Sequence, residues 1–209
     1  GALPVTDRRL DVAGIPTAML EGGEGPPIVL VHGAGESGLH WMRVIPSLAT
    51  THRVLAPDLP AHGASGALPD GAAAQTVDWL AELIDCTCDV EPVVVGGTLG
   101  GAVAARVAAA YPDRLEGLVL VDALGLTAFT PEPRFSQALS GFLAQPGEQT
   151  HDDLWRVCTY DLDRVREAMG EDWESMLVYN LDRVAAPQTM PGVGALMQEF
   201  GLHAIPAEE

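Results

Sequence analysis

Short apolar runs alternate with alanine-rich segments over the first 124 residues, and this pattern constrains the fold more than any other feature. The apolar runs are nearly unbroken, which is typical of strands buried on both faces of a parallel sheet. They lie at residues 28–31, 53–56, 92–95 and 118–121. The segments between them predict helices at residues 41–48, 73–84 and 101–111. This order predicts an α/β fold, a mostly parallel sheet with helices on both faces, preceded by a hairpin at 9–12 and 17–20.

Beyond residue 124 the pattern changes to helical periodicity interrupted by prolines. We therefore expect two domains, a core at 1–124 and a helical module at 125–209. Thr150, followed three residues later by Asp153, predicts the start of a helix. Apolar side chains at helical spacing predict one buried helix face, formed by Leu154, Val157, Cys158, Leu162 and Val165.

The charge balance excludes several classes of partner and cofactor. The net charge is −18 and all 11 basic residues are arginines, so we expect binding neither to nucleic acid nor to an anionic membrane surface. Without lysine the chain cannot form a Schiff base with pyridoxal phosphate or build a phosphate-binding P-loop. No apolar run reaches the roughly 18 residues of a membrane span, and the N-terminal segment lacks the pattern of a signal peptide. The three cysteines, Cys86, Cys88 and Cys158, follow no regular framework and indicate reduced thiols in a cytoplasmic setting.

The most informative segment is a strand that runs almost directly into a helix, Val95-Gly96-Gly97-Thr98-Leu99-Gly100-Gly101. So sharp a turn is expected to hold Thr98 in a strained backbone conformation above the sheet edge. Gly96 and Gly100 are small because the strand and helix backbones nearly touch there. Thr98 then lies at a helix N-terminus, where backbone N–H groups and the helix dipole favour developing negative charge.

Four segments together resemble the α/β-hydrolase superfamily. The turn is similar to its nucleophile elbow, Gly-x-Ser-x-Gly, with Thr98 at the position where serine is usual. Three other segments match the family, and all four keep its order along the chain. Val31-His32-Gly33-Ala34-Gly35 is similar to the oxyanion loop. The remaining two are Asp58-Leu59-Pro60-Ala61-His62-Gly63-Ala64-Ser65 and Tyr111-Pro112-Asp113-Arg114-Leu115.

The resemblance implies a role for each matching residue. Thr98 would supply the attacking hydroxyl, and the backbone N–H groups of Leu99 and Ala34 would form the oxyanion hole. Residues 125–209 match the helical lid that determines the substrate in this family. Three further residues are expected to shape loops through side-chain hydrogen bonds to the backbone, namely His32, Asp58 and His62.

The sequence departs from the family pattern at two points. Threonine is β-branched, and its methyl group would crowd the reacting atoms, so we predict weaker activity than in a Thr98→Ser variant. The acid and histidine of the family's triad follow the nucleophile in the chain, and the strands that carry them are missing here. We therefore expect a part of a longer protein, with an unpaired sheet edge and exposed apolar surface. The alternatives within the chain are Asp122 as acid, His203, His151 or His40 as base, and Ser37 as nucleophile.

The resulting hypothesis is hydrolysis of a small uncharged ester or a related bond, without a metal or organic cofactor. Lactones, epoxides and carbon–carbon bonds remain open as substrates, and the oligomeric state is undetermined. One alternative is a hydrolase-like module that binds a small apolar ligand without turnover. Another is dinucleotide binding, because residues 33–38 match Gly-x-Gly-x-x-Gly after a strand and Asp58 lies at a spacing suited to a ribose contact.

Overall fold

The structure, a computed structural model, describes residues 3–69, 72–186 and 189–204 and divides into two compact units. The first unit contains the chain up to Phe129 and also the segment 189–204, whereas the second contains residues 130–186. This division differs from the expected domains at 1–124 and 125–209. The reason is that Leu196 and Phe200, late in the chain, are buried in the main hydrophobic core of the first unit.

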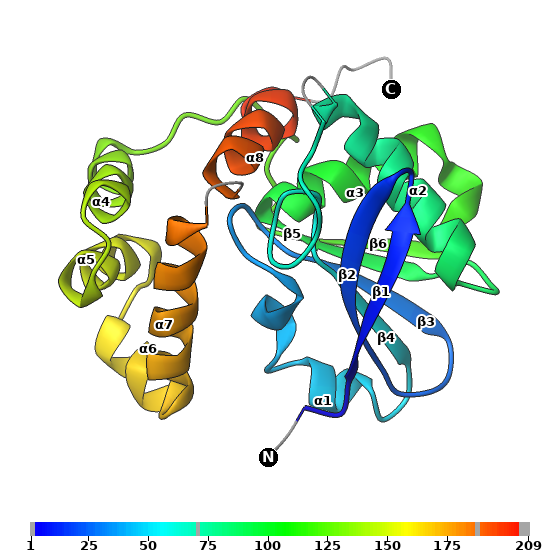
Figure 1. Cartoon of the computed structure of the whole chain (residues 1–209), viewed down its shortest axis with the longest axis horizontal. Helices are drawn as coiled ribbons and strands as arrows, with labels where there is room; N and C mark the ends of the chain where they lie inside the picture. The colour runs from blue at the N-terminus through cyan, green and yellow to red at the C-terminus, as the bar shows by residue number, and fades with distance from the viewer. Residues whose placement is uncertain (1–2, 70–71, 187–188, 205–209) are drawn as a thin grey trace. The chain divides into compact units, whose positions relative to one another are not determined.

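A six-stranded sheet forms the frame of the first unit (Figure 1). Its strands are β1 (Thr6–Val12), β2 (Ile15–Gly22), β3 (Pro27–Val31), β4 (Arg53–Pro57), β5 (Val93–Gly97) and β6 (Gly117–Val121). They lie in the order β1-β2-β4-β3-β5-β6. The last four strands in this order, β4, β3, β5 and β6, are parallel to one another. β1 and β2 are antiparallel at one edge, so the expected mostly parallel α/β sheet is confirmed.

Helices cover both faces of the sheet because its central strands are apolar on both sides. All five residues of β3 are buried. Val29 and Val31 belong to the core beneath α2 (Thr76–Thr87) and α3 (Thr98–Ala110), whereas Ile28 and Leu30 belong to a second core with Ile45 of α1 (Ile45–Leu48). The alternation of side chains along a strand therefore separates the two cores.

The first unit differs from expectation mainly in its connections. The hairpin turns through Ala13 and Gly14, whose φ angles of 52° and 76° suit a two-residue turn, so its strands are longer than predicted. The helix predicted at 41–48 is divided into the 3-10 turn η1 (Gly38–Trp41) and the short α1. A second 3-10 turn, η2 (Ala73–Gln75), precedes α2, and a third, η3 (Pro112–Arg114), follows α3.

The second unit consists of four helices, α4 (Pro133–Ala144), α5 (Glu148–Cys158), α6 (Leu162–Met169) and α7 (Asp172–Ala185), among the residues described. The helix start predicted at Thr150 is wrong, because α5 begins at Glu148 and the Thr150 hydroxyl donates to the carbonyl of Gly147 at 3.0 Å. The apolar face predicted across Leu154 to Val165 is also wrong. The chain leaves the helix between α5 and α6, and Val157 is 40 % exposed.

The last described elements of the first unit are α8 (Thr189–Leu196) and the π-helical turn η4 (Met197–Gly201). Among the described strands β6 pairs only with β5, and Val119, Leu120 and Val121 are 46 %, 36 % and 46 % exposed. This confirms the expected unpaired edge with exposed apolar side chains. None of the described helices combines the length and the apolar character needed to cross a lipid bilayer.

Candidate active site

The turn from β5 into α3 places Thr98 in an unusual backbone conformation. Gly97 is the last residue of β5 and is extended, with φ −97° and ψ 135°, and Thr98 begins the helix with φ +45°. Left-handed backbone is disfavoured for residues with a Cβ, and most of all for β-branched ones. The carbonyl of Thr98 accepts a hydrogen bond from the N–H of Leu124 at 3.0 Å, which fixes the turn against the chain after β6. The strained conformation expected from the sequence is therefore present.

The glycines on either side of Thr98 allow the strand and the helix to touch. A Cβ on Gly96 would lie 2.6 Å from the Cα of Gly101, and one on Gly100 would lie 2.7 Å from the carbonyl carbon of Val31. Neither backbone can move aside without displacing the central strands. The turn can therefore be this tight only because both positions lack a side chain.

The loop after β3 lies directly against the Thr98 side chain. A Cβ on Gly33 would overlap Oγ1 of Thr98, so the hydroxyl and this loop are in contact. Thr98 itself is half-buried. The sequence predicted that these two segments meet, although they are separated by more than 60 residues.

The direction of the Ala34 N–H follows from bonds on the other side of its peptide group. The carbonyl of Gly33 accepts from the N–H of Glu36 at 3.2 Å and lies 2.8 Å from Nδ1 of His32. In a trans peptide the N–H points opposite to the carbonyl, so the Ala34 N–H is directed away from both donors. Leu99, in the first turn of α3, likewise has a backbone N–H without an intrahelical acceptor.

His32 is held in one tautomer. Its Nε2 accepts from the backbone N–H of Leu59 at 2.9 Å, so Nδ1 carries the proton and donates it to the Gly33 carbonyl. The side chain is fully buried. His62, whose ring centroid is 5.3 Å from that of His32, has its Nδ1 2.9 Å from the carbonyl of Pro60.

Asp58 fixes the far end of the same loop. Its Oδ1 accepts from the N–H of Gly38 and its Oδ2 from the N–H of Ala64, both at 2.7 Å. Burial raises the pKa of Asp58, and the two backbone hydrogen bonds act in the opposite direction. The contacts expected of His32, Asp58 and His62 are therefore present, since each side chain meets backbone atoms of the loops after β3 and β4.

The comparisons with known proteins show the family of the chain. The sequence model described as alpha/beta hydrolase fold matches residues 26–192. The chain belongs to the alpha/beta hydrolase fold family. It is 37 % identical to a pimeloyl-[acyl-carrier protein] methyl ester esterase of Aeromonas hydrophila, over 87 % of this chain and 69 % of that protein.

Other relatives in this family carry different names. A 2-hydroxymuconate semialdehyde hydrolase of Pseudomonas sp. is 31 % identical over 59 % of this chain and 46 % of that protein. The solved structure of 2-hydroxy-6-oxo-6-phenylhexa-2,4-dienoate hydrolase from Rhodococcus sp. has a TM-score of 0.79 at 23 % identity and covers 99 % of this chain and 77 % of that one. A second esterase, from Chromobacterium violaceum, is matched over 37 % of its length. The chain thus spans only part of each relative.

The alternative residues considered from the sequence lie in different parts of the described chain and have other contacts. The Ser37 hydroxyl is buried and accepts from the N–H of Leu39 at 3.2 Å as the cap of η1. His151 is buried in the second unit, His203 is exposed near the end of the described chain, and Asp122 is exposed after β6 with φ +49°. Within the described residues the Thr98 hydroxyl makes no hydrogen bond to a histidine or carboxylate.

The dinucleotide alternative is contradicted by the use of the glycine-loop amides. In such a fingerprint the backbone N–H groups face a pyrophosphate. Here the N–H of Gly33 donates to Oε2 of Glu36 and that of Gly38 donates to Oδ1 of Asp58, each at 2.7 Å. Two carboxylates thus occupy the donors that an anionic ligand would need.

Glu36 is the residue that sequence reasoning missed. Its carboxylate bonds the Gly33 N–H, and its other oxygen lies 3.2 Å from Nδ1 of His40. A glutamate three residues after a backbone donor is the spacing of a side chain that returns to its own loop, and this spacing could have revealed it.

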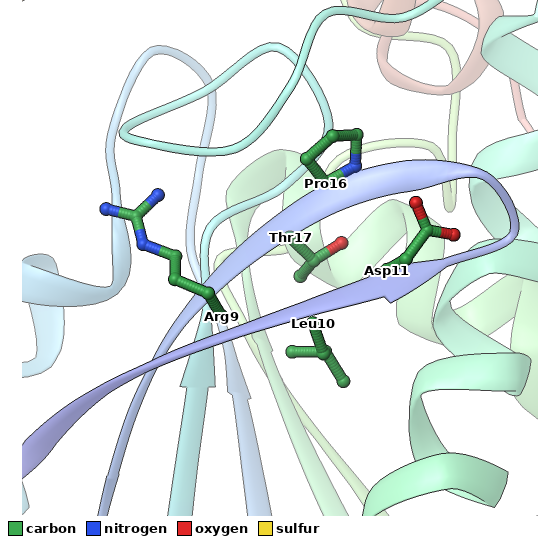
Figure 2. Close-up of a pocket in the computed structure, with 5 residues that line it drawn as sticks. All are labelled: Arg9, Leu10, Asp11, Pro16 and Thr17. Carbon is green, nitrogen blue, oxygen red and sulfur yellow. The ribbon is translucent and has the colours of Figure 1, made fainter.

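A hollow of about 310 Å³ lies away from this site, on the hairpin of β1 and β2 (Figure 2). It is lined by Arg9, Leu10, Asp11, Pro16 and Thr17. Figure 2 shows these side chains coming from the two strands of the hairpin. Among the described residues no group of three or more histidine, cysteine, aspartate or glutamate side chains is placed to hold a metal ion.

Proposed function

We propose that this chain carries the nucleophile and the oxyanion hole of a hydrolase for small uncharged esters or related bonds. The observation that carries the proposal is the contact between the Thr98 hydroxyl, at φ +45° on a helix N-terminus, and the loop that presents the Ala34 N–H. In a helix N-terminus the free N–H groups favour negative charge. This combination suits attack on a carbonyl group.

In the proposed reaction Oγ1 of Thr98 attacks the carbonyl carbon while a base takes its proton. The carbonyl electron pair moves to the oxygen, and the N–H groups of Leu99 and Ala34 donate to that oxyanion. Collapse of the intermediate expels the alcohol, which receives the proton, and leaves an ester on Thr98. Water then attacks this ester by the same sequence and releases the acid. We assign the base to none of His40, His151 and His203, since none bonds Thr98.

The relatives guide the choice of bond without naming the substrate. The Aeromonas protein is named for a methyl ester and the Pseudomonas protein for a semialdehyde product of ring cleavage. An ester is the simpler choice because the fraction of the chain shared with the esterase is larger. Residues 130–186 would act as the lid that selects the substrate.

An acyl-transfer experiment tests this proposal. 4-Nitrophenyl acetate should release nitrophenol and leave an acetyl group on Thr98, detected by intact mass and peptide mapping. Thr98→Ala should abolish the adduct at this position. Absence of any adduct on the folded wild-type chain, with nitrophenol release no faster than in buffer, would refute the nucleophile assignment.

A second candidate function is ligand binding without turnover. It is favoured by the absence of a histidine bonded to the Thr98 hydroxyl among the described residues and by the threonine methyl group. In that case a small apolar ester would bind with unchanged affinity after Thr98→Ala and would be recovered intact. Calorimetry with both proteins distinguishes the two functions.

A further inference from the structure

The carboxylate of Glu36 lies beside the Thr98 hydroxyl. A Cβ on Gly33 would overlap Oγ1 of Thr98 and would also come within 2.8 Å of Oε2 of Glu36. The hydroxyl and the carboxylate therefore occupy the same side of Gly33 and are neighbours across it. Both groups lie against the loop after β3, at the position of the missing Gly33 side chain.

Two contacts fix the carboxylate in this place. Oε2 accepts from the backbone N–H of Gly33 at 2.7 Å, and Oε1 lies 3.2 Å from Nδ1 of His40. The Glu36 side chain is 31 % exposed, so it is ordered by the loop yet open to the space in front of it. The Glu36 carboxylate therefore brings a negative charge to the proposed reacting centre.

Such a charge acts on the substrate through its closeness. In a near-attack arrangement the scissile carbonyl carbon lies about 3–3.5 Å from the nucleophile, so groups next to that carbon come within a few ångströms of Glu36. Two like charges at about 5 Å in a partly solvated site repel each other strongly enough to lower the reaction rate of an anionic substrate by roughly 100-fold. Partial exposure of Glu36 reduces this to about tenfold.

We propose that Glu36 is a specificity-determining residue that selects neutral esters over esters with a negative charge beside the scissile bond. The inference rests on the proposed hydrolase function and adds the residue that discriminates against anionic esters at that site. The net charge of −18 acts in the same direction at longer range, since it lowers the local concentration of anions.

The experiment compares two esters that differ in this charge. The substrates are the 2-acetoxybenzoate anion and methyl 2-acetoxybenzoate, and the readout is the ratio of their kcat/KM values at neutral pH, with the rate in buffer subtracted. We expect the wild-type protein to prefer the neutral ester by about tenfold or more. Glu36→Gln, which keeps an oxygen to accept the Gly33 N–H, should reduce the ratio by about tenfold.

A matched charge change provides the control. Glu24 is exposed in the turn before β3, at the opposite end of this strand from Glu36, and Glu24→Gln should keep the wild-type ratio. Equal hydrolysis of the two esters by wild type, an unchanged ratio in Glu36→Gln, or loss of both activities in a folded Glu36→Gln protein would overturn the inference while the hydrolase function stands. Failure of wild type on both esters would instead remove the proposed function and this inference with it.

Discussion

Thr98 adopts a backbone conformation that is unfavourable for a threonine side chain. At φ +45° a residue with a Cβ is disfavoured by about 1–2 kcal/mol, and β-branching adds crowding. The turn nevertheless keeps this conformation, since Gly96 lets β5 touch α3, Gly100 lets α3 touch the end of β3, and the N–H of Leu124 bonds the Thr98 carbonyl. The strain is thus imposed by the surrounding packing.

The first prediction concerns the methyl group of Thr98. Thr98→Ser keeps the hydroxyl and removes the methyl group that shares its Cβ. We expect nitrophenyl ester hydrolysis to rise by about 10–100-fold, because displacement of reacting groups by about 1 Å has an effect of this size. Steady-state rates of the two proteins give the result, and Thr98→Ala serves as the inactive reference. Equal rates for threonine and serine would contradict the prediction.

Among the elements, the contact between α3 and β3 depends on a single missing side chain. A Cβ on Gly100 would meet the backbone of Val31 and His32. Gly100→Ala is therefore expected to destabilise the first unit by about 3 kcal/mol, because backbone atoms cannot move aside as a flexible side chain can. Urea unfolding followed by circular dichroism measures this change.

The control for Gly100→Ala is the same substitution at a helical glycine with free space around it. A Cβ on Gly141, in α4, would have no neighbour within 4 Å. Gly141→Ala should stabilise the second unit by about 0.5–1 kcal/mol, since alanine is the better helix former. If both alanines had the same effect, the close approach of α3 to β3 would not be the cause.

The edge strand β6 leads to a prediction about association. Its exposed Val119, Leu120 and Val121 lie on a strand with one free side, which is a template for pairing with another chain. Val119→Lys should lower light scattering and the binding of an apolar dye, because charge on an edge opposes pairing. Val90→Lys, at a residue that is 57 % exposed outside the strands, is the control and should change neither signal. Similar effects of the two lysines would refute a role for the edge.

At the scale of the whole molecule, the two compact units contain different buried polar groups. The second unit is built around His151, which is 1 % exposed and lies against Phe142, Trp155 and Trp173. Its Nε2 is 3.0 Å from Nδ2 of Asn180, and its Nδ1 has no partner among the described residues. Burial lowers the pKa of His151, Arg166 acts in the same direction, and Asp152 opposes them.

This lowered pKa predicts a response to pH in one unit. The unfolded chain binds the proton more readily than the folded one, so stability is complete above the unfolded-state value of about 6.5 and is lost as pH falls through the lower folded value. When the pH is lowered from 7.5 to 5, hydrogen-exchange protection factors, which correct for the intrinsic pH dependence of exchange, should therefore fall in α4 to α7 before they do in β3 and β5. His151→Gln should weaken this dependence, whereas His203→Gln, at an exposed residue, should not. An equal fall of the protection factors in both units would count against a His151 origin.

The sequence by itself determined the parts of this protein that depend on local pattern. Short, nearly continuous apolar runs are typical of strands in a parallel sheet, and this pattern placed β3, β4, β5 and β6 within a residue or two, although β6 proved to be an exposed edge strand. Gly96, Thr98 and Gly100 likewise fixed the sharp turn, because only glycine permits strand and helix to touch. The meeting of this turn with the Gly33 loop was implied by the resemblance to the α/β-hydrolase superfamily.

Tertiary packing decided what no local pattern contains. The helical segment 189–204 looks like the residues before it in sequence, yet Leu196 and Phe200 are buried with the sheet, since burial depends on which surface is available. The helix break between Cys158 and Leu162 was invisible because apolar spacing continues across it. The place of Glu36 beside Thr98 joins side chains more than 60 residues apart, and only the folded chain brings that charge to that hydroxyl.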